Sequence, residues 1–482
     1  MAASFLFYDL ETSGVNPREA RVMQFAAQRT SLQLEPIGDP YNYLIALTPD
    51  VLPDPEAILI TGITPQQTIE SGYTEAEFLE LFHDEIATPG TIFTGFNSVR
   101  FDDEFMRFLN YRNFYDPYEW SWKDDRSRWD LLDVVRMTRA LRPEGIEWPF
   151  ASDGSATNRL ELLAQVNKLL HEKAHDALSD VLATIAVAKL IRTKQPKLFD
   201  YLLSIRDKRS VAEIVASDQP FVYTSGRYDG DHEKTTVAVK LADVPDQPGA
   251  ALVYDLRYSP DDYVSKTENE LLQAWQSRQS EREFPLPVKV IRYNRCPAVA
   301  PLGVLDKSSQ KRLSIDTADV KQQLARLQKH HSELADVFQR VVASARPSQQ
   351  EDLLGIDDTE VDSRLYDGFF SAKDASTMAR VRSAKPEELA IEAFEFQDQR
   401  LKTLLPLYKA RNYPQHLTRE ERAEWEDFRY RRLMHGDGQS RLAQFARRLQ
   451  AAAEHIVLKS PEKKFLLEEL QLYAESIAPI ES

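Results

Sequence analysis

Two carboxylates stand two residues apart at the end of an apolar run near the N-terminus. The run Phe5-Leu6-Phe7-Tyr8 is followed by Asp9-Leu10-Glu11-Thr12-Ser13-Gly14. Residues i and i+2 of a strand point to the same face, so Asp9 and Glu11 would project together. Such a pair raises its own pKa values, and a bound divalent cation would offset the repulsion. Alone, an Asp-x-Glu pair is more often solvated surface, so the hypothesis depends on further acidic residues later in the chain.

A third carboxylate follows an apolar strand predicted over residues 91–95. The segment Asn97-Ser98-Val99-Arg100-Phe101-Asp102 leads into a helix expected from about Val99 to Leu109. Phe101, Phe105 and Phe108 would share one face of that helix. Asp102 lies near the helix N-terminus, where the macrodipole stabilises a carboxylate. That explanation suffices structurally, whereas a functional interpretation directs Asp102 at the strand pair.

A histidine and a fourth acid stand at the start of a later helix, in His175-Asp176-Ala177-Leu178-Ser179-Asp180. The spacing of Leu178, Val181, Leu182 and Ile185 predicts one buried stripe, and Asp180 lies among these positions. A buried aspartate without a partner is costly, so Asp180 needs a partner. His175 precedes the helix and is placed to swing over a site. A structural role for the histidine is equally compatible with the pattern.

Together these residues have the composition of a two-metal hydrolytic site. Carboxylate oxygens suit Mg²⁺ or Mn²⁺ rather than Zn²⁺. Four carboxylates can hold two ions about 3.5–4 Å apart, the arrangement for phosphoryl transfer to water. His175 would take the proton from the attacking water. The five candidate residues are Asp9, Glu11, Asp102, His175 and Asp180.

An aromatic stretch at residues 111–122 is followed by several arginines up to position 142. Aromatic rings beside arginine can stack bases and hold phosphates, which is how proteins grip a single strand without reading its sequence. Acidic residues are as numerous as basic ones in this part of the chain, however. Many of the rings are therefore equally well explained as core.

Composition narrows the class of protein. A chain of 482 residues exceeds one hydrophobic core, so two or three domains are expected. The net charge of −16 argues against a non-specific nucleic-acid coat protein. Cys296 is the single cysteine, which excludes an internal disulfide and a cysteine-based metal site. No signal segment or membrane-spanning run is recognised, and a soluble cytoplasmic protein is expected.

The motifs in this order resemble the DEDD exonuclease superfamily, in its histidine-containing branch. Additional segments resemble bacterial exonuclease I, the single-strand DNA exonuclease that works from the 3′ end and releases 5′-mononucleotides. These segments are residues 59–65, 97–104, 111–122, 127–134, 140–146, 365–370 and 410–414. The resemblance therefore covers the whole chain.

The resemblance implies roles for individual residues. Asp9, Glu11, Asp102 and Asp180 would be the metal carboxylates for two Mg²⁺ ions, with Mn²⁺ able to substitute, and His175 the general base. Glu11 and Arg159 would contact the substrate. Further strand contacts are implied for Arg107, Tyr118, Trp122, Arg136 and Arg142. The implied partners are single-stranded DNA and single-stranded DNA-binding protein, the implied role is in DNA repair or recombination, and a monomer without membrane contact is expected.

The resemblance also implies three domains. Residues 1–195 would form an α/β exonuclease domain of the RNase H-like fold, 196–349 an SH3-like β domain, and 350–482 a helical C-terminal domain. From the residues alone, short strands at 221–225, 235–241, 252–258 and 288–292 predict a small barrel or sandwich. One charged helix is expected over 317–343, and helices beyond position 347. In the first domain a strand is expected over 41–47. Helix starts are predicted at Thr64-Pro65, at Thr418 with Glu421, and at Ser460-Pro461. The resemblance further implies that the last two domains close over the nuclease cleft and enclose the strand, which would explain processivity.

Two alternatives remain open at this stage. An exoribonuclease or RNA-trimming enzyme of the same superfamily would share the catalytic residues, because a metal site acts on any phosphodiester and discrimination depends on the 2′-OH. A catalytically inactive single-strand-binding scaffold would be expected to lack at least one carboxylate, and all are present.

Overall fold

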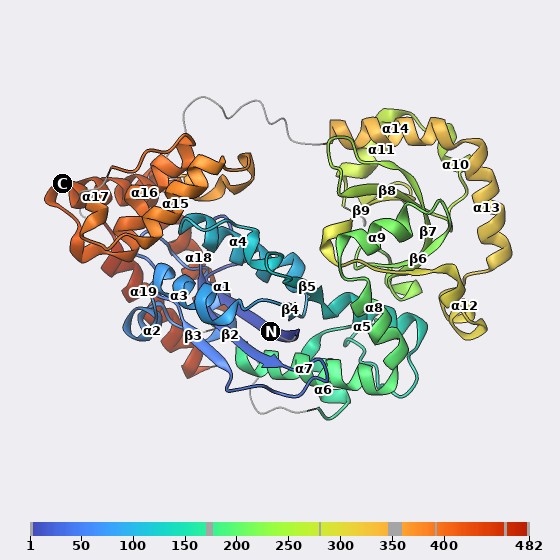
Figure 1. Ribbon diagram of the computed structural model, residues 1–482, viewed down its shortest axis with the longest axis horizontal. Helices are drawn as coiled ribbons and strands as arrows, with labels where there is room; N and C mark the ends of the chain where they lie inside the picture. The colour runs from blue at the N-terminus through green and yellow to red at the C-terminus, as the bar shows by residue number, and fades with distance from the viewer. Residues whose placement is uncertain are drawn as a thin grey trace.

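The computed structural model describes residues 3–169, 177–278, 281–345, 359–390, 393–456 and 460–479. Along the chain, an α/β domain (residues 3–204) is followed by a β domain (208–344) and a helical lobe (359–477). Figure 1 shows the α/β domain between the other two, with the β domain on one side and the helical lobe on the other. Among the described residues, no helix is both long and apolar enough to cross a bilayer.

The α/β domain is built on a five-stranded mixed sheet in the order β3-β2-β1-β4-β5. Strand β1 pairs antiparallel with β2 and parallel with β4, and β4 pairs parallel with β5. The strands are β1 (Ser4–Thr12), β2 (Val22–Thr30), β3 (Tyr41–Leu44), β4 (Thr91–Gly95) and β5 (Ser127–Asp130). The central position of β1 buries it on both faces.

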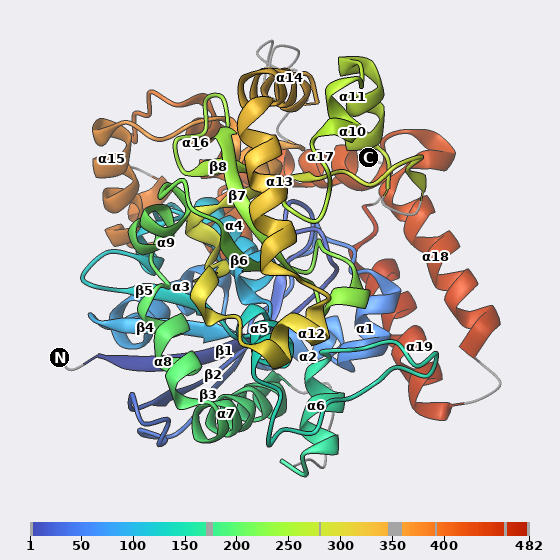
Figure 2. The ribbon, with the colours of Figure 1, turned by 90° about the vertical axis from the view of Figure 1, so that its right-hand side faces the viewer.

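Alternation along β1 assigns its side chains to two cores. Phe5 and Phe7 belong to a core that includes Val181 of α7 (Ala177–Lys194). Leu6 and Tyr8 belong to the opposite core, with Phe105 of α4 (Asp102–Arg112). Asp9 and Glu11 continue the Phe5 and Phe7 face because strand side chains alternate. They therefore lie on the side of the sheet that α7 covers; Figure 2 shows that helix against the strands.

Further helices surround this sheet in the described part of the chain. Thr64 and Thr74 form capping boxes at the starts of two of them, and the former was predicted from Thr64-Pro65. The helices are α1 (Pro55–Thr61), α2 (Pro65–Ser71), α3 (Glu75–Leu81), continued by a π-helical turn (Phe82–Ile86), α5 (Leu131–Leu141), α6 (Leu160–Val166) and α8 (Pro196–Ser204), with α9 (Lys208–Val215) leading into the β domain.

The β domain is a second five-stranded sheet, antiparallel throughout, in the order β10-β6-β7-β8-β9. Its strands are β6 (Phe221–Thr224), β7 (Thr235–Asp243), β8 (Ala250–Asp255), β9 (Val288–Arg292) and β10 (Ala298–Pro301). Its helices are α10 (Asp261–Val264), α11 (Glu268–Gln276), α12 (Lys307–Leu313), α13 (Thr317–Lys329) and α14 (His331–Ser344). The sheet and α14 share a core with the α/β domain.

The helical lobe contains five α-helices among its described residues. They are α15 (Ala372–Ser383), α16 (Gln399–Asn412), α17 (Arg419–Met434), α18 (Arg441–Ile456) and α19 (Pro461–Ile477). Thr418 caps α17 in a capping box and Ser460 caps α19 ahead of Pro461, as the sequence predicts. The lobe packs on the α/β domain through Leu470 against Met23 and Ile58. Figure 2 shows α19 beside α1 and α2.

Buried ions also join the helical lobe to the α/β domain, and we call this group the interdomain ion cluster: Arg21, Asp50, Asp362, Arg411 and Arg432. Arg21 Nη2 lies 2.7 Å from Asp362 Oδ2, and Arg411 Nη2 lies 2.7 Å from Asp50 Oδ2. Arg411 also contacts Asp362 at 2.8 Å, and Arg432 Nε lies 3.5 Å from Asp50 Oδ2. All five residues are buried. Opposite charges therefore compensate one another across this interface.

The expected element boundaries needed several corrections. The single helix expected over 317–343 is two helices, because the backbone of His330 leaves the helical region with φ of −111° and ψ of 11°. The helix expected from Val99 begins at Asp102, after a 3₁₀ turn at Ser98–Arg100 and a non-helical Phe101. The strand expected over 41–47 ends at Leu44.

The buried faces that the sequence predicts for two helices, α7 and α4, were also wrong in part. Leu182 is 39% exposed and lies outside the buried stripe that Val181 and Ile185 form on α7. Phe108 packs with the helical lobe, whereas Phe101 and Phe105 belong to the core under the sheet. Phe108 packs there because the helical lobe covers the C-terminal end of α4.

Candidate active site

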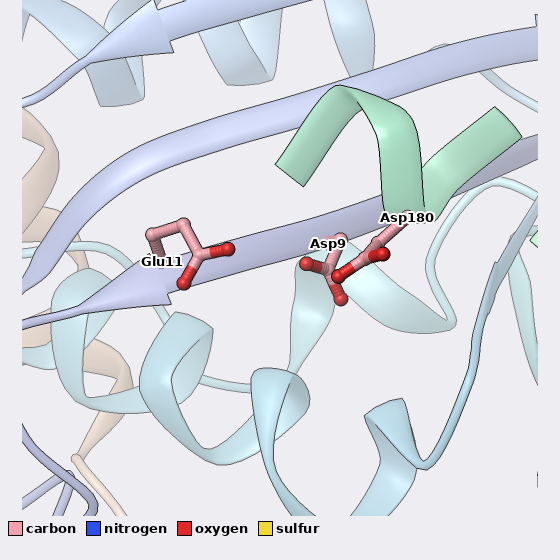
Figure 3. A group of neighbouring side chains, drawn as sticks. All are labelled: Asp9, Glu11 and Asp180. Atoms are coloured by element: carbon pink, nitrogen blue, oxygen red, sulfur yellow. The ribbon is translucent and has the colours of Figure 1, made fainter. Parts of the chain in front are cut away.

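Three of the predicted carboxylates form one cluster at the end of β1. Asp9, Glu11 and Asp180 each offer an oxygen, and the three oxygens lie within 4.8 Å of one another. Figure 3 shows Asp180 reaching from α7 toward Asp9, with Glu11 further along the strand on the same side. All three side chains are partly buried. Hard oxygen donors at this spacing suit Mg²⁺ or Mn²⁺.

The topology explains why the cluster forms at this point. Strand β4 pairs with β1 only from Ser4 to Phe7, so Asp9 and Glu11 extend past the end of the parallel pair. On the other edge β2 stays paired, with Ala26 opposite Asp9 and Gln24 opposite Glu11. Asp9 and Glu11 are therefore paired through the backbone with β2 alone, and their side chains are uncovered where β4 turns away.

The chain that leaves β4 returns beside Asp9 and brings Asp102 to the site. Gly95 permits the turn, since a Cβ there would lie 2.6 Å from the Cβ of Ser98. Asn97 takes a left-handed conformation with φ of 71°. Asp102 then accepts a hydrogen bond of 3.2 Å from the backbone N–H of Leu10. The fourth predicted carboxylate is therefore adjacent to the cluster of three.

The carboxylate of Asp130 holds the backbone of this returning loop. Its carboxylate accepts hydrogen bonds from the backbone N–H groups of Asn97 at 3.0 Å, Val99 at 3.2 Å and Leu132 at 2.9 Å. Burial, together with the charge of Asp133, raises the pKa of Asp130 to about 6. One side chain thus caps α5 and fixes the loop that positions Asp102.

Asp103 gives α4 a second anchor. Tyr8 donates a 2.5 Å hydrogen bond to its Oδ1, and Arg128 pairs with its Oδ2. Asp103 is buried and faces the side of the sheet opposite the cluster, with Tyr8. The two consecutive aspartates therefore do different work: Asp103 holds the helix to the sheet, and Asp102 lies at the site.

Electrostatics at the cluster oppose ionisation. Burial raises the pKa of Asp9 well above its ordinary value, and the charges of Asp102, Glu11 and Asp180 raise it further. Burial and then Asp103 raise the pKa of Asp102. Like charges are thus concentrated in one place, which is the environment a divalent cation would stabilise.

The predicted general base, His175, lies outside the described residues. The described chain resumes two residues later at Ala177, where α7 begins. Its placement therefore stays a prediction, as does its role.

The predicted strand contacts have varied surroundings. Arg107 is 5% exposed and pairs with Glu104 at 2.6 Å, with its guanidinium 5.5 Å from the centre of the Tyr118 ring. Trp122 is 60% exposed. Arg159 is exposed at the N-cap of α6. Roles for these residues at a bound strand stay predictions.

Two other predicted contacts have partners within the protein. Arg136 pairs with Asp133 at 2.7 Å. Arg142 pairs with Asp306 at 3.1 Å and donates a 2.8 Å hydrogen bond to the carbonyl of Val304, both in the β domain. These contacts give Arg142 a structural role between domains, beside any role toward a strand.

Sequence reasoning did not single out Asp103 and Asp130, which hold the elements that position Asp102, or Glu104, which pairs with Arg107. The run Asp102-Asp103-Glu104 is a weak local signal, because it places three consecutive acids at a helix start, and the macrodipole alone accounts for such a run. Asp130 also had a local signal, since it precedes Leu131 and its helix as an N-cap.

The mixed sheet, with clustered carboxylates at the end of its central strand, is an arrangement suited to a metal-dependent nuclease. Family profiles agree with this and extend it along the chain. Residues 6–188 match the family described as Exonuclease, 206–344 the Exonuclease I SH3-like domain, and 359–477 the Exonuclease I C-terminal domain.

Curated relatives define the family more closely. Exodeoxyribonuclease I of Haemophilus influenzae is 39% identical over 439 residues, covering 89% of this chain and 90% of the relative. Exodeoxyribonuclease I of Escherichia coli is 37% identical over 479 residues, covering 98% of each. The chain therefore belongs to the exodeoxyribonuclease I family. The predicted order of exonuclease, SH3-like and helical C-terminal domains is confirmed.

Solved structures of exonuclease I, two of them from E. coli, share the whole fold. One is a complex with a dA16 oligonucleotide, with a TM-score of 0.90. A second is a zinc ion bound form of its complex with single-stranded DNA, with a TM-score of 0.90, and a third is described as SSB/Exonuclease I with an inhibitor, with a TM-score of 0.87. Each is 36% identical and covers 99% of this chain and 100% of that chain.

Proposed function

We propose that this protein is a processive 3′-to-5′ exonuclease that degrades single-stranded DNA to 5′-mononucleotides. The observation that carries the proposal is the cluster of Asp9, Glu11 and Asp180 with Asp102 beside it, in a chain of the exodeoxyribonuclease I family. All four carboxylates of the expected site are present, which favours an enzyme over an inactive scaffold. The oligonucleotide complex of the E. coli relative supports single-stranded DNA as the substrate.

The donor set supports a divalent cation as cofactor, and we propose Mg²⁺, with Mn²⁺ able to replace it and two ions per site. The fit rests on the oxygen ligands of Asp9, Glu11 and Asp180 and on the raised pKa of Asp9. The zinc-bound form of the E. coli relative supports divalent-metal binding in the family. When bound, such a cation supplies Lewis acidity and lowers the pKa of coordinated water.

The protein residues would hold and orient the reacting groups. Asp9, Glu11 and Asp102 are fixed by the sheet and by the Leu10 N–H, so they require little reorganisation when substrate binds. Asp180 approaches from a separate element, α7, and joins that helix to the site. His175, five residues earlier, would accept the proton of the attacking water.

We further propose that Glu11, Arg159, Arg107, Tyr118, Trp122, Arg136 and Arg142 contribute to strand binding. Exposed Trp122 offers a ring for base stacking, and exposed Arg159 offers a phosphate ligand. Single-stranded DNA-binding protein is the proposed protein partner, supported by the structure described as SSB/Exonuclease I, which shares this fold. A cytoplasmic location, a monomeric state and a role in DNA repair or recombination complete the proposal, together with domain limits near 195 and 349.

The first test is a time course with matched oligonucleotides labelled at the 5′ end: single-stranded DNA, duplex DNA, single-stranded RNA and a 3′-blocked DNA. We expect rapid loss of the unblocked single-stranded DNA alone, stopped by EDTA. Faster loss of RNA would transfer the proposal to the exoribonuclease alternative. Tight DNA binding without cleavage would favour the scaffold.

Two substitutions test the residue roles. Asp180→Ala should abolish cleavage and leave strand binding largely intact, and retained cleavage with Mg²⁺ would overturn the metal assignment. His175→Ala should slow cleavage by about 10²–10⁴-fold, the usual contribution of a general base. A loss of only a few-fold would place the base elsewhere. Asp200→Asn, an exposed change on α8, is the matched control.

A further inference from the structure

Glu104 is a carboxylate on α4 that contacts groups from all three parts of the molecule. Its Oε1 lies 2.6 Å from Nη1 of Arg107 on the same helix and 2.6 Å from Nη2 of Arg295 in the β domain. Its Oε2 accepts a hydrogen bond from the hydroxyl of Tyr366 in the helical lobe. One side chain of the α/β domain thus binds both flanking parts of the chain, which are 71 residues apart at Arg295 and Tyr366.

The carboxylate of Glu104 is more shielded from solvent than its two interdomain donors. Its side chain is 14% exposed, those of Arg107 and Arg295 are 7% and 26% exposed, and Tyr366 is 42% exposed. Burial opposes ionisation of Glu104, but Arg107, Arg295 and the Tyr366 hydroxyl hold its pKa below the ordinary value. Charge-assisted hydrogen bonds with little solvent access are stronger than exposed ion pairs.

Neighbouring contacts reinforce the attachment of the β domain at the same place. Arg295 also donates to the carbonyl of Val99, just before α4. The adjacent carbonyl of Asn294 accepts a 2.8 Å hydrogen bond from Arg128. On the other side, Tyr366 packs edge-on against Phe108, with ring centres 5.9 Å apart. Both flanking parts therefore dock on α4, which lies between them in Figure 1.

We propose that Glu104, with Arg295 and Tyr366, is the joint that keeps the β domain and the helical lobe closed around a bound strand. The inference rests on the proposed exonuclease activity and deepens it by assigning processivity to named residues. Glu104 is a positioning residue: its carboxylate is engaged by three protein donors and carries out no chemistry. The joint determines how long a strand is retained, and the carboxylate cluster determines how fast each bond is cut.

The physical argument depends on the geometry of the three donors. A carboxylate accepts from all of them, because both of its oxygens are acceptors. An amide at this position would turn one acceptor into an NH₂ donor facing arginine or the tyrosine hydroxyl. Glu104→Gln therefore breaks the joint while preserving side-chain size. Tyr366→Phe removes one hydroxyl from a side chain that is already 42% exposed, which keeps the risk of misfolding low.

The test measures strand retention and bond cleavage separately. Processivity is the mean number of nucleotides removed from a long 5′-labelled strand after excess unlabelled DNA is added as a trap. Cleavage is the single-turnover rate on a tetranucleotide, which does not depend on how long a strand is retained between cuts, measured over a Mg²⁺ titration. We expect Glu104→Gln to shorten the processive run about tenfold, as for loss of one charge-assisted hydrogen bond.

The other variants make the expectation specific. Tyr366→Phe should shorten the run about threefold, and the double variant should be no worse than Glu104→Gln, because the two changes remove a shared contact. The tetranucleotide rate and its Mg²⁺ midpoint should stay unchanged in all of them. Glu80→Gln, the same change at an exposed position on α3, should leave both measurements unchanged.

Two outcomes would overturn the inference. Wild-type run lengths in both Glu104→Gln and Tyr366→Phe would show that closure does not depend on the joint. An equal loss in run length and tetranucleotide rate would reduce Glu104 to a structural support of the active site. Failure of the proposed function is distinguishable, since the wild-type protein itself would then leave single-stranded DNA intact.

Discussion

Two clusters of buried charge in this molecule are built in opposite ways. In the interdomain ion cluster, burial opposes ionisation of Asp50 and Asp362, but Arg411, Arg432 and Arg21 hold their pKa values below the ordinary value. At the end of β1, burial and neighbouring carboxylates raise the pKa of Asp9. The first cluster satisfies its charges within the protein. The second gathers negative charge that favours a bound cation, and the difference separates a structural site from one built for a metal.

Of the predicted changes, Asp9→Asn should have the largest effect, and it tests whether the cluster at the end of β1 serves a metal rather than the fold. The change should lower cleavage by several orders of magnitude because a metal carboxylate is lost. Without Mg²⁺ it should leave the free energy of unfolding equal or higher, since one of several repelling charges is removed. Parallel activity assays and urea unfolding check both halves. A variant that was both inactive and unstable would mean that the cluster contributes to the fold.

Asp362→Asn should have the reverse effect. It leaves Arg21 and Arg411 buried with reduced compensation, and we expect a loss of about 3–5 kcal/mol in unfolding free energy. Urea unfolding followed by fluorescence measures the change. Asp427→Asn is the matched control, because that exposed aspartate pairs with Arg431 at 2.9 Å on the surface of α17. The control should change stability by less than about 1 kcal/mol.

Adding Mg²⁺ distinguishes the two clusters, because a ligand that binds only the folded state raises the free energy of unfolding. At a Mg²⁺ concentration about 100 times the dissociation constant, the folded state should gain about 2.7 kcal/mol. The gain should disappear in Asp9→Asn and persist in Asp362→Asn. Thermal or urea unfolding with and without Mg²⁺ provides the measurement. A gain that survived Asp9→Asn would locate the metal elsewhere.

A partly buried histidine, His83, extends the comparison to the effect of pH on stability. Burial lowers the pKa of His83 to about 4, with Arg382 and Arg126 opposing its charge. Its ring stacks on Tyr115 at 4.1 Å, and its Nε2 lies 2.7 Å from Asn110 Oδ1. The unfolded chain takes up a proton near pH 6.5, so the contribution of His83 is complete above that value. It is lost as the pH falls toward 4, by about 2 kcal/mol at pH 5.

His83→Gln should flatten the pH dependence of unfolding between pH 6.5 and 4. The amide can still donate to Asn110, so the neutral structure is retained. His331→Gln, at an exposed position at the start of α14, serves as control. An unchanged slope in His83→Gln would assign the acid sensitivity to other groups.

Rules that depend on neighbouring residues predicted part of the candidate site and several helix starts. Alternation placed Asp9 and Glu11 on one face, and the helix starts at Thr64, Thr418 and Ser460 were read from their capping residues. These features depend on neighbours within a few positions. The family resemblance supplied the rest of the domain order, which periodicity alone left open.

The interdomain features were beyond sequence reasoning. Arg21 and Asp362 are 341 positions apart, and Glu104 and Tyr366 are 262 apart, so no spacing links them. Arg107 was expected at the strand, yet its closest charged partner is Glu104 on its own helix. The break at His330 also escaped notice, because apolar periodicity continues on both sides and neither proline nor glycine marks it.

The packing of α19 on α1 and α2 has a consequence for synthesis of the protein. The helix that completes this contact begins at Pro461, whereas the α/β domain has its last cluster carboxylate at Asp180. At a ribosomal rate of about 5–20 residues per second, the two are separated by roughly 15 to 60 s. A nascent chain would therefore carry all four candidate carboxylates before the helical lobe exists. The proposed enclosure of a strand would become possible only near the end of translation.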